Sequence, residues 1–363
     1  MNLTKSFIEK LVRFGFELMP NSAAVRFGEL VGQRRQDPRC DVELWRLMDH
    51  QTGTLRNLSN DDLAERWRGI AKNILYLVGP SRDVDGLDAN AFSSWWWLQK
   101  LIHTEFELER RSLPNPDVPD IACPSALHPQ FYIDRAIAPR YWARIGEGVH
   151  LLKTLHDGEI RFRPASSYDD PLLNAARRDR ELEKIRKRPG QVTTITLPNG
   201  AYSIPIGDVS YSRRSAAETD GVLRDREYWI SSWSLEFDPR LFAEFNTDAQ
   251  PPCDAVIVVW DTEKLGERIE AAARQQFPGW LFADIPMRYF DPHELQPSPA
   301  LHASMEKDFS YGYQRELRLA LGPSYPIEKG QPILLKVGPL TDIAGLYSSG
   351  GHKLGGVRPP TWR

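Results

Sequence analysis

Apolar residues in the first third of the chain recur three or four positions apart. Segments 7–18, 63–77 and 95–106 each carry this spacing, which predicts an apolar face on an α-helix. The second segment follows the stretch SNDD at 59–62, which resembles a capping box and predicts where that helix begins. The three consecutive tryptophans at 95–97 are better interpreted as helix packing than as a binding platform. Residues 1–112 are therefore predicted to form a helical N-terminal domain.

A proline-rich stretch follows the helical region. Residues 111–130 read RSLPNPDVPDIACPSALHPQ and contain five prolines, which end helices and restrict the residues before them. We therefore predict a linker over 113–135 and a second domain over 136–363.

The hydrophobic pattern changes after this linker. Short runs rich in β-branched and aromatic residues are separated by turn residues, and they predict strands at 160–165, 193–197, 228–237, 254–261, 316–321 and 332–337. Helices are expected only around 172–187, 240–246 and 262–276. This order of elements is typical of a β-rich α+β domain and not of a βαβ repeat. The common phosphate-binding motifs GxGxxG and GxxxxGK[ST] are absent from the sequence.

Composition excludes several classes of protein. The net charge of −3 gives no overall basic field for nucleic acid, although residues 175–188 (AARRDRELEKIRKR) would give a helix with one positive face. That stretch has an equally good interpretation as a solvated helix with internal ion pairs. The three cysteines form no CxxC pair and the eight histidines form no HExxH motif, so we expect no disulfide framework and no metal. No run resembles a signal peptide or a membrane span, which predicts a cytoplasmic protein without a membrane partner.

Three stretches in the second domain carry the candidate chemistry. They are RYWAR (140–144), YWISSWS (228–234) and YGYQRELRL (311–319). Alternation on a strand would put Ser232 and Ser234 on one face, and would put Gln314, Glu316 and Arg318 on one face of the last stretch. Together the three stretches offer a cation, a pair of hydroxyls and a carboxylate.

This ordered set resembles the ADP-ribosyltransferase superfamily of the arginine-serine-glutamate type. Four segments also resemble an uncharacterised bacterial domain family that has FNDP and YExE motifs and is placed near those transferases: LHDGEIRFRPASSYDDPL (155–172), ISSWSLEF (230–237), DAVIVVWDTEKL (254–265) and EKDFSYGYQRELRLAL (306–321). The chain departs from that family in three ways. FNDP is YDDP at 168–171, the stretch after the serine strand is replaced by PRLFAEFNTDAQPP, and the first glutamate of ExE is Gln314.

The resemblance implies a split β-sandwich of two small packed sheets, with NAD bound as co-substrate in the cleft between them. Glu316 would stabilise the positive charge that develops on the ribose when nicotinamide leaves, and it would accept a hydrogen bond from the ribose 2′-hydroxyl. Ser232 would orient Glu316, with Ser234 beside it in the cofactor site. Arg144 would bind the phosphate or the ribose edge of NAD.

The resemblance also implies how nicotinamide and the acceptor are recognised. Trp229 or Tyr168 would stack on nicotinamide. Gln314, about 6–7 Å from Glu316 along the strand, would receive the acceptor. In this respect the chain is similar to enzymes of the superfamily that modify acceptors other than arginine. Together with the basic stretch, the glutamine favours a nucleic-acid acceptor over an arginine side chain.

The function implied is that of a mono-ADP-ribosyltransferase acting on a macromolecule, as a bacterial toxin or antiphage effector. The helical region would contact an antitoxin or regulator. Two alternatives stay open: an NAD glycohydrolase, and a non-catalytic binding or assembly module on the same fold. Each residue alone also has a plainer interpretation, because Arg144 could pair with Glu147, the serines could face solvent, and Glu316 with Arg318 could be an exposed pair.

Overall fold

The N-terminal part of the structure contains two packed helices. The computed structural model describes residues 55–78, 92–121, 141–188, 195–196, 200–203, 208–219, 222–235, 237–247, 252–293, 302–323, 325, 327 and 330–358. Helix α4 spans Asn60–Val78 and helix α5 spans Phe92–Arg110, which confirms the two helices predicted in this range. The Ser59 hydroxyl accepts a hydrogen bond from the backbone N–H of Asp62 and caps α4. The helix predicted over 7–18 lies outside the described residues.

The helices share a hydrophobic core with the C-terminal part of the chain. Trp97 is buried beside Leu101, as the packing interpretation predicted, and the same cluster contains Leu241, Phe309 and Tyr313 from the second half of the sequence. Residues 113–121 form no helix or strand, and the rest of the predicted linker lies outside the described residues. No helix in the described ranges is long and apolar enough to cross a membrane.

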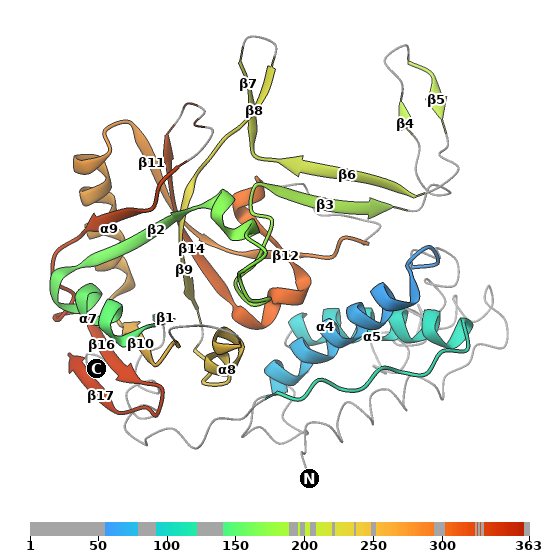
Figure 1. Ribbon diagram of the computed structural model, residues 1–363, viewed down its shortest axis with the longest axis horizontal. Helices are drawn as coiled ribbons and strands as arrows, with labels where there is room; N and C mark the ends of the chain where they lie inside the picture. The colour runs from blue at the N-terminus through green and yellow to red at the C-terminus, as the bar shows by residue number, and fades with distance from the viewer. Residues whose placement is uncertain are drawn as a thin grey trace.

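A large antiparallel sheet forms the centre of the molecule (Figure 1), so the fold is α+β as predicted. Seven of its strands lie in the order β11 (Trp280–Pro286), β14 (Glu316–Pro323), β9 (Trp229–Ser234), β1 (Trp142–Gly146), β10 (Ala255–Val259), β16 (Ala344–Ser348) and β17 (Lys353–Gly356). The remaining two, β2 (Glu159–Pro164) and β15 (Ile333–Lys336), form a separate branch that begins at β9.

The sheet forks at β9. One edge of β9 pairs with β14 along its whole length. On the other edge, Trp229 and Ile230 pair with β2, whereas Ser234 pairs with Ala143 of β1. The two branches therefore separate where β9 runs through 231–233. As far as the structure describes the chain, both branches belong to one nine-stranded sheet.

Alternating side chains of the sheet enter two hydrophobic clusters. On β10, Ala255, Ile257 and Val259 enter one cluster, while Val256 and Val258 enter the other. Helices α7 (Gly148–Asp157) and α9 (Thr262–Gln276) contribute to the first cluster, and the short helix α8 (Leu241–Asn246) contributes to the second. The predictions of helices at 240–246 and 262–276 are confirmed. Asp261 caps α9 by accepting a hydrogen bond from the backbone N–H of Lys264.

The predicted helix at 172–187 is wrong. Its second half is strand β3 (Glu183–Arg188), which pairs with β6 (Val209–Arg214) in a ribbon outside the main sheet (Figure 1). Two more ribbons pair β4 (Ile195–Thr196) with β5 (Tyr202–Ser203), and β7 (Ala216–Thr219) with β8 (Val222–Asp225). A short parallel pair joins β12 (Arg288–Phe290) to β13 (Glu306–Asp308).

Buried ion pairs favour a strand over a helix in this stretch. Lys184 and Arg186 lie on the same face of β3, and both are buried. Lys184 Nζ lies 2.6 Å from Asp179 Oδ2, and Arg186 Nη2 lies 2.7 Å from Glu306 Oε1. These two cations therefore do not contribute to the exposed positive face that the sequence suggested.

Candidate functional site

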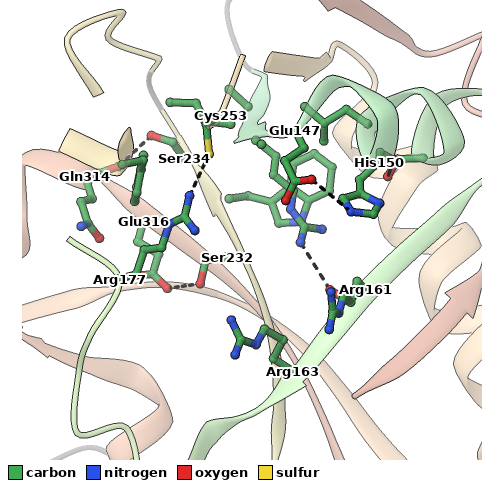
Figure 2. A pocket seen from close by; sticks show the side chains of 18 of the residues that line it. Glu147, His150, Arg161, Arg163, Arg177, Ser232, Ser234, Cys253, Gln314 and Glu316 are labelled. Carbon is green, nitrogen blue, oxygen red and sulfur yellow. Dashed lines mark hydrogen bonds and ion pairs between the residues drawn. The ribbon is translucent and has the colours of Figure 1, made fainter. Parts of the chain in front are cut away.

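A cavity of about 540 Å³ opens where the sheet forks, a volume typical of small-molecule sites. Residues from β1, β2, β9 and β14 line it. Figure 2 shows Arg177, Ser232, Gln314 and Glu316 on one side, and Glu147, His150 and Arg161 on the other. Six of the predicted site residues line this one cavity: Arg144, Tyr168, Ser232, Ser234, Gln314 and Glu316.

Glu316 is a buried carboxylate that is held by three donors. It begins β14 and is only 3% exposed. Its Oε1 accepts hydrogen bonds from Ser232 Oγ at 2.7 Å and from Arg318 Nε at 3.2 Å, and its Oε2 accepts from Lys307 Nζ at 2.7 Å. Burial alone would raise the pKa of Glu316, but Arg318 and Lys307 outweigh burial and hold that pKa well below its usual value.

Strand register brings Ser232 to Glu316. Across β9 and β14, Ser232 is opposite Arg318 and Ser234 is opposite Glu316. Ser232 therefore reaches Glu316 diagonally, on the face that the alternation predicted. Ser234 Oγ donates at 2.7 Å to the backbone carbonyl of Gln314, so it fixes the chain just before the strand.

Arg144 contacts a serine that the sequence analysis did not select. Its Nη1 donates at 2.8 Å to Ser231 Oγ, and its guanidinium lies 5.8 Å from the centre of the Trp233 ring. Ser231 points to the opposite face of β9 from Ser232. Arg144 and Glu316 are therefore hydrogen-bonded to serines on opposite faces of this strand, although both side chains line the same cavity. Burial lowers the pKa of Arg144 from its ordinary value.

The predicted position of Gln314 is wrong. Gln314 ends the 3₁₀ helix η5 (Phe309–Gln314), and Arg315, in the left-handed conformation with φ of 45°, separates it from the strand. Its Oε1 accepts from Lys307 Nζ at 2.9 Å, and its Nε2 donates to the backbone carbonyl of Ala176 at 2.7 Å. Gln314 is buried, and both ends of its amide are engaged within the protein.

The two candidates for stacking on nicotinamide differ in location. Trp229 does not line the cavity, because its ring is buried against Trp280 in the hydrophobic core and its Nε1 donates to the backbone carbonyl of Gln331. The prediction for Trp229 is therefore wrong. Tyr168, in the 3₁₀ helix η2 (Ala165–Asp169), lines the cavity with its ring 5.4 Å from the Arg163 guanidinium.

Three further arginines line the cavity, and the sequence analysis did not select them: Arg161, Arg163 and Arg177. Within the described part of the chain, none of these three pairs with a carboxylate, and neither does Arg144. The Nε atom of Arg163 is buried and has no hydrogen-bond partner among the residues that the structure describes. The sequence could have indicated two of them, because strand alternation in the segment RFR of β2 gives Arg161 and Arg163 a common face.

Lys307 was also missed by the sequence analysis. It is 5% exposed, and it joins Gln314 to Glu316 through one ammonium group. Because Lys307 and Glu316 lie nine positions apart on different strands, periodicity could not pair them.

The plainer interpretations of these residues do not describe the structure. Glu147 lies 3.4 Å from His150 and not in an ion pair with Arg144. Glu316 and Arg318 are both buried, and Arg318 also pairs with Glu181 at 2.8 Å. The site therefore combines a fixed carboxylate with four arginines that pair with no carboxylate of the described residues, and this suits an anionic ligand.

No family model, no curated protein and no solved structure matches the chain.

Proposed function

We propose that this chain is an ADP-ribosyltransferase that moves ADP-ribose from NAD to a macromolecular acceptor. One observation carries the proposal. Arg144, Ser232 and Glu316 are far apart in sequence, yet all three line a single cavity, and Ser232 orients the Glu316 carboxylate within it.

The chemistry needs a fixed negative charge beside the ribose. In the transfer, the bond between ribose C1′ and the nicotinamide nitrogen breaks, and its electron pair stays on nicotinamide, which leaves as a neutral molecule. The acceptor nucleophile then bonds to C1′ and loses its proton. Positive charge builds on the ribose during this exchange, and an ionised Glu316 in a shielded cavity stabilises it strongly.

The cations of the cavity support a dinucleotide as ligand. Arg144, Arg161 and Arg163 project from β1 and β2, and no carboxylate of the described residues neutralises them. The diphosphate of NAD carries two negative charges, and guanidinium groups bind phosphate oxygens in pairs. Tyr168 offers an aromatic ring in the same cavity, which would stack on nicotinamide.

The forked sheet supports an ADP-ribosyltransferase-like fold, because a split between two branches of strands is what the resemblance implies around an NAD cleft. The acceptor is a nucleic acid or a protein, and the biological role is that of a toxin or antiphage effector. Since Lys184 and Arg186 are buried and paired, the preference for nucleic acid now depends on the arginines of the cavity.

The proposal is tested by incubating the protein with NAD labelled in its adenosine part, together with separate pools of protein, DNA and RNA. We expect label in one pool, and we expect Glu316→Gln to reduce its incorporation about 100-fold or more, because the charge that stabilises the transition state is removed. Glu270→Gln makes the same chemical change on the exposed side of α9 and should leave the incorporation unchanged.

Other outcomes separate the alternatives. Consumption of NAD without label in any pool, lost in Glu316→Gln, indicates a glycohydrolase. The absence of both NAD consumption and saturable NAD binding by the wild-type protein rejects the enzyme and supports a non-catalytic module.

A further inference from the structure

The chain segment that leads into Glu316 is held mainly by the N-terminal helices. This segment is η5, and it packs against α4. Asn73 of α4 donates through its Nδ2 to two successive carbonyls of the segment, at 3.4 Å to Phe309 and 3.1 Å to Ser310. The described helical region therefore fixes the backbone of η5 as well as its side chains.

Aromatic contacts hold both ends of this segment. At its start, Phe309 lies 5.9 Å from Trp97 between ring centres, with the Arg66 guanidinium 5.0 Å from the Phe309 ring. At its end, Tyr313 lies 4.9 Å from Tyr76. All four aromatic side chains are buried, so the contacts exclude water and resist displacement.

Gly312 fits a space that no larger residue can occupy. A Cβ atom at this position would lie 2.7 Å from Trp97 Cζ2 and 2.9 Å from Asn73 Oδ1. Helices α4 and α5 thus approach the backbone of η5 closely from two directions.

The end of η5 connects directly to the site. Gln314 closes the segment, the strained residue Arg315 turns the chain, and Glu316 follows as the first residue of β14. A shift of η5 would therefore move Gln314 and Glu316 relative to Lys307 and Ser232. Arg144, Arg161 and Arg163 belong to β1 and β2, where strand pairing sets their positions.

We propose that α4 and α5 form a positioning unit for the reaction, which holds η5 so that Glu316 stands in its working geometry. This inference rests on the proposed function. Loosening the unit should lower turnover much more than it weakens NAD binding, because phosphate-binding cations and the carboxylate are held by different parts of the fold. A partner that competes for the buried face of α4 would therefore switch the activity off.

The test uses the full chain with Asn73→Ala, Gly312→Ala and the control Arg68→Ala, which changes an exposed residue of α4. Three quantities are measured: kcat with NAD, the dissociation constant of NAD from tryptophan quenching, and backbone hydrogen exchange over 309–316. We expect Asn73→Ala to lower kcat at least 10-fold, to change the NAD dissociation constant less than 2-fold, and to speed exchange over 309–316. Arg68→Ala should change none of them.

Each result decides something different. Faster exchange with kcat unchanged overturns the positioning role, and so does an equal loss of kcat and NAD affinity. If exchange over 309–316 stays slow in Asn73→Ala, the helices do not hold η5, and the inference fails even where the enzyme is active. A wild-type protein that neither binds nor consumes NAD rejects the proposed function and with it the positioning role. If Gly312→Ala does not fold, Asn73→Ser supplies the second variant. It shortens the side chain at position 73 and so removes the hydrogen bonds from Asn73 to η5.

Discussion

Gln314 illustrates how a single amide can be fixed from both ends. Its Oε1 accepts from Lys307 and its Nε2 donates to the carbonyl of Ala176. Gln314→Glu removes that donor and adds a second carboxylate beside Lys307, which already pairs with Glu316. We expect the substitution to lower the free energy of unfolding by about 1–3 kcal/mol, measured by urea denaturation.

Gln276→Glu is the matched control for this substitution. The Gln276 side chain also donates to a backbone carbonyl, that of Lys336, but it does so at the exposed end of α9. We expect a change within about 0.5 kcal/mol there. Equal effects at positions 276 and 314 would contradict the buried role of the Gln314 amide.

Sequence reasoning reached part of this residue-scale picture. Strand alternation predicted that Glu316 and Arg318 share a face, and the structure agrees, because alternation depends on local backbone geometry alone. The hydrogen bond between Ser232 and Glu316 was expected only from the family resemblance. Alternation could not predict that Arg144 contacts Ser231, since that bond depends on the register between β1 and β9. It also failed at Arg315, where one left-handed residue ends the strand that was expected to include Gln314.

At the scale of elements, one buried carboxylate links both N-terminal helices to the chain that follows β12. Asp291 follows β12 and accepts hydrogen bonds from both terminal nitrogens of Arg66 on α4, at 2.7 and 2.8 Å, and from Lys100 on α5 at 2.7 Å. These two cations hold the pKa of Asp291 well below its usual value, although burial opposes them. Asp291→Asn removes the negative charge that lies between these two buried cations.

We expect Asp291→Asn to destabilise the protein by about 3–5 kcal/mol, the effect of breaking a buried ion pair. Asp342→Asn provides the comparison, because Asp342 pairs with Lys264 and Arg268 but is 46% exposed, and a change of about 0–1 kcal/mol is expected there. Both values are measured by urea denaturation. A loss for Asp291→Asn as small as that for Asp342→Asn would mean that this network does not hold the helices.

For helices and strands, the local sequence pattern predicted the element correctly where the tertiary contacts favour the same conformation. Helix α9 was predicted at its observed bounds, and the structure shows that its buried apolar face and its Asp261 cap agree with those bounds. The charged stretch at 175–188 was assigned to a helix because its charges suit a solvated face. The pairing with β6 and the buried partners Asp179 and Glu306 make it a ribbon instead, and these partners are distant in sequence or have no periodic signal.

The stability of the whole molecule should fall as the pH drops below neutrality. Burial lowers the pKa of His293 from 6.5 to about 4, with Arg66 and Lys187 adding to burial while Asp291 and Asp208 oppose it. Between these two values the unfolded chain binds a proton that the folded chain does not, so the free energy of unfolding falls as the pH decreases from about 6.5 to about 4. The contribution of His293 is up to about 3 kcal/mol.

His293→Gln removes this titration. We expect the variant to lose less stability than the wild-type protein between pH 7 and pH 4, as measured by urea unfolding at a series of pH values. Parallel pH profiles for the two proteins would show that His293 is not responsible.

The overall class was predictable, whereas the way the parts join was not. Short apolar runs between turns indicated an α+β fold, and the structure agrees. The proline-rich stretch suggested two separate domains, yet Leu241, Phe309 and Tyr313 enter the helical core. Such long-range packing leaves no periodic trace in the sequence.

The fork at β9 has a consequence for how ligand recognition will be measured. Between Ile230 and Ser234, no strand among the described residues pairs with β9 on the cavity side. Successive residues of a strand direct their amide and carbonyl groups to opposite edges, so at least one main-chain pair among 231–233 faces the gap. Replacing side chains cannot delete these groups. Alanine scanning of this wall will therefore underestimate its share of the binding affinity, and only backbone substitution, such as an ester in place of an amide, will reveal it.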